Sequence, residues 1–323
     1  MNRIQTIRNH ILFSGQKKRV HIVAMGDVGT TIAIGLKLCG ADCIHTIGVY
    51  DTNKDMVARC MMELNQITLP FDLDALPAVG EIDDETLFDC DVFVFTASRS
   101  VPPVGEGGDV RMAQLAGNAR IVEHYARLAR ERLFSGLFAV VSDPVDLLCQ
   151  CAYYTSNRTD AGAFDGKGLC AEQIRGFGLG VMHARAAYYA KKDARFASYL
   201  TEGRAFGPHG QALVIANSIT HYDDALSLEL TQRTVNANKD VRALGFKPYI
   251  APALSSGAFP LLLTMRGEWH YSAIFEDDIY FGRKNRQTAH GIEVEELPVP
   301  DALMERLDAA RETLRKEGAR WKP

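Results

Sequence analysis

The segment from Val20 to Asp51 constrains the fold of this chain more than any other. Residues 20–24 are apolar and partly β-branched, which predicts a short buried strand. A glycine-containing turn at 25–29 and a helical pattern follow, and a second apolar run at 44–50 ends at an aspartate. This order is typical of a dinucleotide-binding strand–helix–strand unit, although Ala24 stands at the first glycine position.

Each residue type in this unit has a physical role toward a dinucleotide. Gly26 stands where the backbone approaches a pyrophosphate, Val28 lies in the same turn, and Gly29 lets the helix lie close to the strand. The helix N-terminus offers free N–H groups to the phosphates. Asp51 is placed to accept hydrogen bonds from the adenosine ribose, and its charge favours NAD over NADP. We expect Ala24 to keep a negative φ, because a positive φ penalises a Cβ.

Length, charge and cysteine content narrow the class of protein. The 323 residues, 47% of them apolar and 24% charged, predict two globular domains. A net charge of -4 argues against nucleic acid or a membrane surface as partner. The seven cysteines lie mostly in apolar runs, which fits buried thiols in a reducing cytoplasm. We expect no signal peptide, no transmembrane segment and no metal site.

The pattern of strands and helices divides the chain in two. Strand and helix signals alternate regularly through residues 1–178, which predicts a doubly wound parallel sheet of the α/β class, with residues 1–19 as an N-terminal arm. In residues 179–323 the pattern changes to helices with strand-like stretches at 214–218 and 270–281. We therefore expect a dinucleotide-binding domain followed by an α+β substrate domain.

Several polar or small residues follow directly after the predicted parallel strands. Because ligands of such sheets bind at the carboxyl ends of the strands, Gly26, Asp51, Ser98 and Asp143 are expected along one rim. The segment 98–110 is rich in glycine and proline, which is typical of a mobile lid over a site.

Taken in order, the motifs of residues 20–316 resemble the lactate/malate dehydrogenase family. The matching segments are Gly26 and Gly29, Asp51, Thr96-Ala97, Arg111 with Asn118, Ser142-Asp143-Pro144-Val145-Asp146, Ala184-Arg185, Gly207-Pro208-His209-Gly210 and Tyr249-Ile250-Ala251-Pro252-Ala253. The resemblance implies a Rossmann fold, NAD as cofactor, a small-molecule substrate and a homodimer or homotetramer. The implied cofactor contacts are Gly26, Val28, Gly29, Asp51, Thr96, Ala97, Ser98, Asn118 and Ser142.

The resemblance also implies a mechanism. His209 would be the general acid/base that exchanges a proton with the substrate hydroxyl or ketone, a role suited to an imidazole. Arg185 would bind the substrate carboxylate with a bidentate fork that a lysine cannot reproduce. Arg111 would polarise the substrate carbonyl when the lid closes.

Several positions depart from the family pattern. Met182 stands where the family has an aspartate that orients the catalytic histidine, and Asp143 replaces an asparagine at the strand end. The lid has Val101-Pro102-Pro103 where malate-type members have Arg-Lys-Pro. Lys247 falls near a position that borders the substrate side chain. The lid difference argues against malate itself as the substrate.

The exchange of an aspartate for Met182 leaves His209 without the group that fixes its tautomer and stabilises its cation. We hypothesise that Asp143 supplies the missing charge, either by pairing with His209 or by meeting a cationic group of the substrate. In the alternative, Asp143 points aside and the enzyme is weak. Asp143 should also repel a substrate carboxylate unless Lys247 or Arg185 offsets its charge.

The sequence therefore predicts an NAD-dependent oxidoreductase that moves a hydride reversibly between a 2-hydroxy acid and NAD. One alternative is a divergent dehydrogenase for an imine or amino-bearing substrate, which Asp143 favours. The other is a non-catalytic NAD-binding or sensing protein, which Met182 favours.

Overall fold

The structure is a computed structural model that describes residues 15–98, 110–210 and 212–322, with only the backbone at 110–113. Most of the predicted lid and of the N-terminal arm lies outside these residues. The first strand starts at Lys18, two residues before the predicted start, so the end of the predicted arm belongs to the sheet. None of the helices in these segments combines the length and the apolarity needed to cross a membrane.

A nine-stranded sheet runs through the described part of the chain in the order β11-β10-β9-β6-β5-β4-β1-β2-β3. Its strands are β1 (Lys18–Val23), β2 (Ile44–Tyr50), β3 (Ala78–Glu81), β4 (Val92–Phe95), β5 (Leu137–Val140), β6 (Ile174–Gly176), β9 (His270–Glu276), β10 (Ile279–Thr288) and β11 (Gly291–Val294). From β3 to β6 all neighbours are parallel. The order 3-2-1-4-5-6 is that of the doubly wound dinucleotide-binding fold. The predicted fold class is confirmed.

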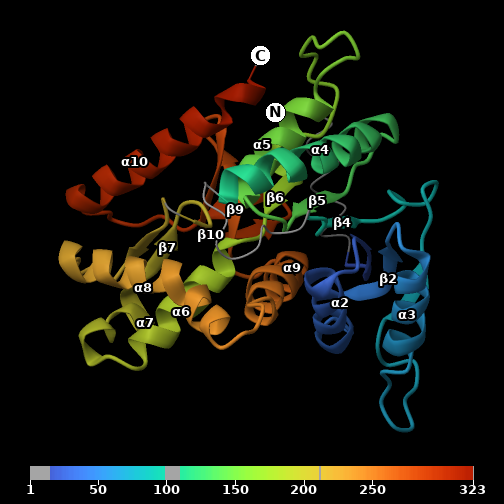
Figure 1. Cartoon of the computed structure of the whole chain (residues 1–323), viewed down its shortest axis with the longest axis horizontal. Coiled ribbons are helices and arrows are strands. Elements are labelled where there is room, and N and C mark those ends of the chain that lie inside the picture. The colour runs from blue at the N-terminus through green and yellow to red at the C-terminus, as the bar shows by residue number, and fades with distance from the viewer. Residues whose placement is uncertain (1–14, 99–109, 211, 323) are drawn as a thin grey trace.

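Helices cover both faces of the sheet (Figure 1). On one face lie α4 (Val110–Glu131), α5 (Val145–Ser156) and α10 (Asp301–Gly318), and on the other α2 (Asp27–Cys39), α3 (Lys54–Asn65), η3 (Pro252–Ala258) and α9 (Phe259–Arg266). Strand β4 is buried on both sides, with Phe93 and Phe95 facing the first group and Val92 and Val94 the second. Its apolar run is what a central parallel strand requires.

The C-terminal part adds the elements that complete the site. Its helices are α6 (Leu179–Ala190), α7 (Tyr199–Glu202) and α8 (Asp224–Ala243), and a small antiparallel pair consists of β7 (Arg204–Phe206) and β8 (Val214–Ala216). Strands β9 to β11 extend the main sheet in antiparallel fashion, beginning with the pair Gly176 and Ala273. The sheet therefore crosses the predicted boundary at 178/179, and the division into two domains stays a prediction.

One strand-like stretch proves to be a hairpin. Residues 270–281 do not form a single strand, because the chain turns at Asp277 and Asp278, both with positive φ, between β9 and β10. The acidic run Glu276-Asp277-Asp278 interrupts the apolar pattern at this turn and was the signal in the sequence that marks it.

The conformation of Ala24 corrects the expectation of a negative φ. Its φ is +70°, in the left-handed region that favours glycine. The Cβ of an L-residue costs roughly 1 to 2 kcal/mol in this conformation. The loop accepts this cost because the main chain at 24 is fixed on both sides: its N–H donates to the Tyr50 carbonyl and its carbonyl accepts from the Thr96 hydroxyl.

We expect Ala24→Gly to raise the free energy of unfolding by about 0.5 to 1 kcal/mol, because the strain at Ala24 exceeds the extra chain entropy of glycine. Urea denaturation followed by circular dichroism measures the change. The control is Ala309→Gly on the exposed face of α10, where glycine should destabilise by about 1 kcal/mol. Equal destabilisation by both substitutions would show that the loop carries no strain at residue 24.

Candidate active site at the carboxyl ends of the parallel strands

The predicted rim exists in the structure. Gly26 follows β1, Asp51 follows β2, Ser98 lies beyond β4 and Asp143 lies beyond β5. These four strands are adjacent and parallel in the order β5-β4-β1-β2, so all four residues lie at the same edge of the sheet. Ligands of open parallel sheets bind at this edge.

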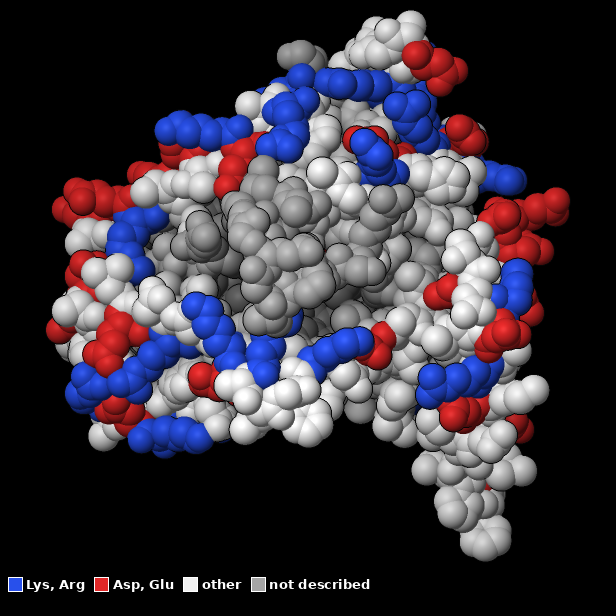
Figure 2. Space-filling view, in the orientation of Figure 1, with Lys and Arg blue, Asp and Glu red and all other residues white. Residues whose placement is uncertain are grey.

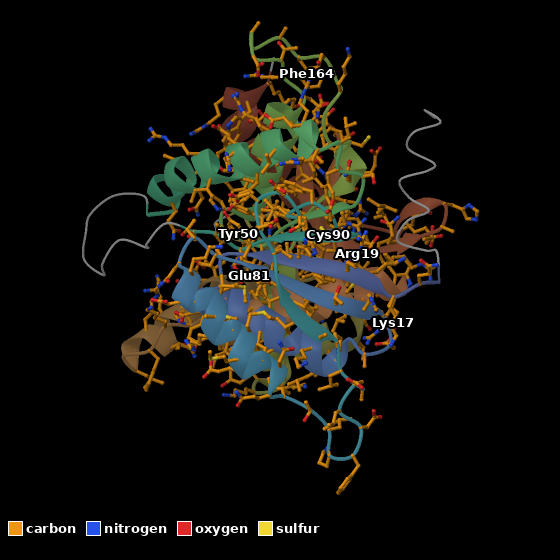
Figure 3. All side chains as sticks on the ribbon, turned by 90° about the vertical axis from the view of Figure 1, so that its right-hand side faces the viewer. Lys17, Arg19, Tyr50, Glu81, Cys90 and Phe164 are labelled. Atoms are coloured by element: carbon orange, nitrogen blue, oxygen red, sulfur yellow. The ribbon has the colours of Figure 1, made fainter. Side chains whose placement is uncertain are left out.

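Figure 3 shows the carboxyl and amino ends of the parallel strands. Tyr50 and Glu81, the last residues of β2 and β3, lie together on one side, and Arg19, near the start of β1, lies on the other. Tyr50 directly precedes Asp51, so the labelled pair marks the edge at which the site is built.

The glycine loop after β1 fits the diphosphate of a dinucleotide. A Cβ at Gly26 would meet no protein atom within 4 Å, and the φ of -70° suits any residue. Neither packing nor backbone geometry therefore requires glycine there, whereas a closely approaching ligand does. A Cβ at Gly29, in contrast, would collide with the carbonyl of Ala24. Helix α2 has no side-chain cap, which leaves its first N–H groups for an anion beside Val28.

The carboxylate of Asp51 shapes this loop. One oxygen accepts a hydrogen bond from the Met25 N–H at 2.7 Å, and the other accepts from the Asn53 N–H at 2.8 Å. Each carboxylate oxygen has a further lone pair, so these contacts leave acceptor capacity for a hydroxyl. The ribose contact of Asp51 stays a prediction.

Thr96 holds the end of β4 against the glycine loop. Its hydroxyl lies 2.7 Å from the carbonyl oxygen of Val23 and 2.8 Å from that of Ala24, both of which accept from it. The same hydroxyl lies close to the Cα of Gly29, where a Cβ would approach it to 2.8 Å. The described contacts of Thr96 are therefore with the main chain of the glycine loop, which they stabilise.

A second set of hydrogen bonds joins the ends of β4 and β5. The buried amide of Asn118, on α4, donates to the Asp143 carbonyl at 2.7 Å and to the Ser98 hydroxyl at 3.3 Å. The Ser142 hydroxyl donates to the Ala97 carbonyl at 2.7 Å. These contacts fix the backbone on which the Asp143 side chain is mounted. The cofactor contacts predicted for Ala97, Ser98, Asn118 and Ser142 stay predictions.

The turn between β7 and β8 carries His209 and is anchored to three other elements. Gly207, with φ of +85°, donates its N–H to the carbonyl of Gly282 in β10. The His209 N–H donates to the carboxylate of Asp146 at 3.3 Å, at the start of α5. The imidazole packs on Gly178, where a Cβ would lie 3.0 Å from the Cβ of His209. A residue larger than glycine at 178 would displace the imidazole.

His209 and Asp143 face each other. Nδ1 of His209 lies 3.0 Å from Oδ1 of Asp143, with the imidazole 16% and the carboxylate 47% exposed. Of the arrangements considered from the sequence, the structure shows the pairing with His209, and the arrangement in which Asp143 points aside is wrong. The contact lies between the end of β5 and the β7–β8 turn, so the carboxylate reaches the imidazole from the sheet rather than from α6.

Arg185 lies on α6, one turn beyond Met182. Its Nη1 is 3.7 Å from the Met182 sulfur, and the structure shows no ion pair between its guanidinium and another described residue. Burial lowers the pKa of Arg185, while the negative charge of Asp143 opposes this shift. Asp143 therefore acts electrostatically on Arg185 and also contacts His209. A partly buried guanidinium without a carboxylate partner is suited to bind an anionic ligand.

No described contact joins the two other predicted site residues, Arg111 and Lys247, to His209 or Arg185. Arg111 is in the first turn of α4, but its side chain and the lid at 99–109 lie outside the described residues. The Nζ of Lys247 lies 3.3 Å from Oδ2 of Asp27, at the start of α2. Sequence reasoning missed this pair and the role of Asp146. Asp146 could have been found, because it ends the sequence motif Ser142-Asp143-Pro144-Val145-Asp146. No pattern in the sequence pointed to a contact of Asp27 with Lys247.

Comparison with known proteins supports the geometry. Residues 18–164 match the model of the lactate/malate dehydrogenase NAD-binding domain. The L-lactate dehydrogenase of Staphylococcus epidermidis is 26% identical over 92% of this chain and 95% of its own length. That of Mesomycoplasma hyopneumoniae (strain 232) is 25% identical over 62% of this chain, and the match spans only 58% of the relative.

Solved structures show the same fold over nearly the whole chain. A malate dehydrogenase from Archaeoglobus fulgidus in complex with NADH has a TM-score of 0.73 at 17% identity, covering 94% of this chain and 99% of the other. A lactate dehydrogenase from a Medee basin deep-sea metagenome library has a TM-score of 0.73 at 19% identity, covering 93% and 98%.

Proposed function

Because the chain belongs to the lactate/malate dehydrogenase family, we propose that it catalyses reversible hydride transfer between a 2-hydroxy acid and NAD. The observation that carries this proposal is the contact of His209 with Asp143, beside a guanidinium that has no ion pair among the described residues. An acid/base group and an anion receptor are the two groups that a 2-hydroxy acid requires.

NAD is the cofactor of this domain, and its nicotinamide accepts or donates the hydride when it is bound. The residues at the first strand fit it. Gly26 leaves room for the diphosphate, the uncapped N-terminus of α2 offers N–H groups, and Asp51 offers carboxylate oxygens to the ribose. Asp143, after β5, lies at the same edge of the parallel sheet as Gly26, after β1, which supports a reacting group beside the cofactor.

His209 acts as the general acid/base. Oδ1 of Asp143 lies 3.0 Å from Nδ1 of His209, and we infer that this carboxylate favours the tautomer with the proton on Nδ1, which leaves Nε2 to exchange a proton with the substrate oxygen. In the oxidation direction Nε2 takes the hydroxyl proton, and Asp143 stabilises the imidazolium that forms. Asp146 and Gly178 position the ring by holding the main chain and the face of His209.

Arg185 binds the substrate carboxylate, and Arg111 polarises the substrate carbonyl from the lid. The first assignment rests on the partial burial of Arg185 and its closeness to Asp143. Binding an anion beside Asp143 carries a repulsion, which the Arg185 charge offsets. The second assignment rests on the position of Arg111 at the start of α4, directly after the predicted lid.

Asp143 also favours a second candidate substrate. Its carboxylate is 47% exposed and lies at the end of β5, so a cationic amino group could meet it while Arg185 binds a carboxylate. A substrate with an imine or amino group would use both charges. The non-catalytic alternative rests on Met182, which removes the carboxylate of α6 that the family uses.

We also propose a cytoplasmic homodimer or homotetramer. All seven cysteines are free, and burial raises the pKa of the thiols of Cys149 and Cys151 well above the ordinary value, which suits a reducing compartment. Large apolar side chains are exposed on three helices: Met62 on α3, Tyr188 on α6 and Phe259 on α9. Sedimentation velocity would measure the assembly.

Oxidation of NADH with a panel of 2-oxo acids tests the proposed reaction. We expect turnover with at least one 2-oxo acid whose side chain is uncharged, and none with the corresponding amides, because Arg185 requires a carboxylate. Adding ammonium or methylamine should leave the rate unchanged for a ketone substrate and raise it for an imine. Tight NADH binding without turnover of any compound would contradict the proposed reaction and favour a sensor.

A further inference from the structure

An exposed ion pair joins the cofactor loop to a segment 220 residues away. The Nζ of Lys247 lies 3.3 Å from Oδ2 of Asp27, and their side chains are 83% and 49% exposed. Asp27 is the first residue of α2, between Gly26 and Val28. The pair therefore lies at the helix terminus where the diphosphate of NAD binds.

The segment that carries Lys247 leads into η3, which packs against α2. A Cβ at Gly257 of η3 would lie 2.6 Å from the Ile32 side chain of α2, so the two helices are in close contact. The Lys247 carbonyl accepts from the Tyr249 N–H, and the Tyr249 carbonyl accepts from the Ala253 N–H at the start of η3. Lys247 is thus connected to the helix that contacts α2, and its closeness to Asp27 follows from this packing.

The charges of this loop are unfavourable for an anion without Lys247. Asp27 is in the first turn of α2, and the Asp51 carboxylate accepts from the neighbouring Met25 N–H. Two carboxylates therefore lie beside the place of a doubly charged diphosphate, and like charges repel. On the face in Figure 2, both Lys or Arg and Asp or Glu side chains lie around the middle of the molecule.

We propose that Lys247 is a cofactor-binding residue: it neutralises Asp27 and attracts the diphosphate of NAD. This assigns Lys247 to the cofactor rather than to the side chain of the substrate. Asp27 in turn holds the lysine at the loop when no cofactor is bound. The proposal rests on NAD binding alone, so it does not depend on which substrate the protein uses.

Titration of NADH fluorescence at low ionic strength tests the proposal. We expect Lys247→Met to raise the Kd of NADH about threefold to fivefold, the size of an exposed charge interaction. Asp27→Asn should lower the Kd, and the double variant should bind like the wild type, because both charges are then gone. The matched control is Lys316→Met on α10, whose pair with Glu312 has a distance of 3.6 Å and exposures of 75% and 52%.

Competition with fragments of NAD separates the diphosphate from other contacts. Lys247→Met should weaken ADP-ribose by the same factor as NADH and leave adenosine unchanged, and the effect should shrink at high salt. Equal Kd values for the Lys247 and Lys316 variants would overturn the proposal. A loss for adenosine as large as for NADH would overturn it as well, since it would indicate a distorted loop rather than a lost charge.

Discussion

Replacing Asp143 with Asn is expected to lower kcat/KM for the 2-oxo acid by roughly a hundredfold to ten-thousandfold, the range found when a histidine loses its orienting carboxylate. The carboxylate oxygen lies 3.0 Å from Nδ1 of His209 and would stabilise the imidazolium in the proposed mechanism. The amide has nearly the same shape but no charge, and its NH₂ group can turn toward Nδ1 and select the wrong tautomer. Steady-state kinetics in both directions measure the loss. Unchanged kinetics of the Asp143→Asn variant in both directions would remove any special role of Asp143.

A compensating change sharpens this prediction. Met182→Asp in the Asp143→Asn background places a carboxylate on α6, where the resemblance to the family expects one. If Asp143 replaces that group, kcat/KM of the double variant should be at least about tenfold higher than that of Asp143→Asn. The control is Asp165→Asn, whose carboxylate pairs with Arg130. We expect the activity of this control to stay within about twofold of the wild type, as for a change outside the site.

Replacing Arg185 with Lys is expected to raise the KM of the 2-oxo acid and to lower kcat/KM by roughly tenfold to a hundredfold, because the lysine keeps the charge but loses one charge-assisted hydrogen bond of the fork, which costs about 1.5 to 3 kcal/mol. The guanidinium is partly buried and has no ion pair among the described residues, so the substrate carboxylate would be its partner. A lysine provides a point charge in place of the planar fork.

Substrate and cofactor affinities separate the roles of Arg185. The Kd of NADH should stay unchanged, and the preference for a 2-oxo acid over its amide should be largely lost. The control is Arg233→Lys, because Arg233 on α8 already forms ion pairs with Glu229 and Asp193. If Arg185→Lys altered NADH binding but left the KM of the 2-oxo acid unchanged, the arginine would belong to the cofactor site instead.

The sequence predicted the elements of the fold because their signals are local. The glycine turn, the buried strand at 92–95 and the alternation up to about residue 178 each depend on neighbouring residues, and together they indicate the parallel sheet and its rim. The hairpin within 270–281 was not predicted, although the acidic run Glu276-Asp277-Asp278 interrupts the apolar pattern at the turn.

The sequence by itself determined that His209, Arg185 and Asp143 are present on a dinucleotide-binding fold. Only the tertiary structure decided what these side chains contact. Asp143 meets His209 because the β7–β8 turn is anchored to β10 and α5, and Lys247 meets Asp27 because η3 packs on α2. The φ of Ala24 was likewise decided by contacts with β2 and β4. Such contacts join segments far apart in the chain, and the direction of a side chain across them depends on packing that no local pattern encodes.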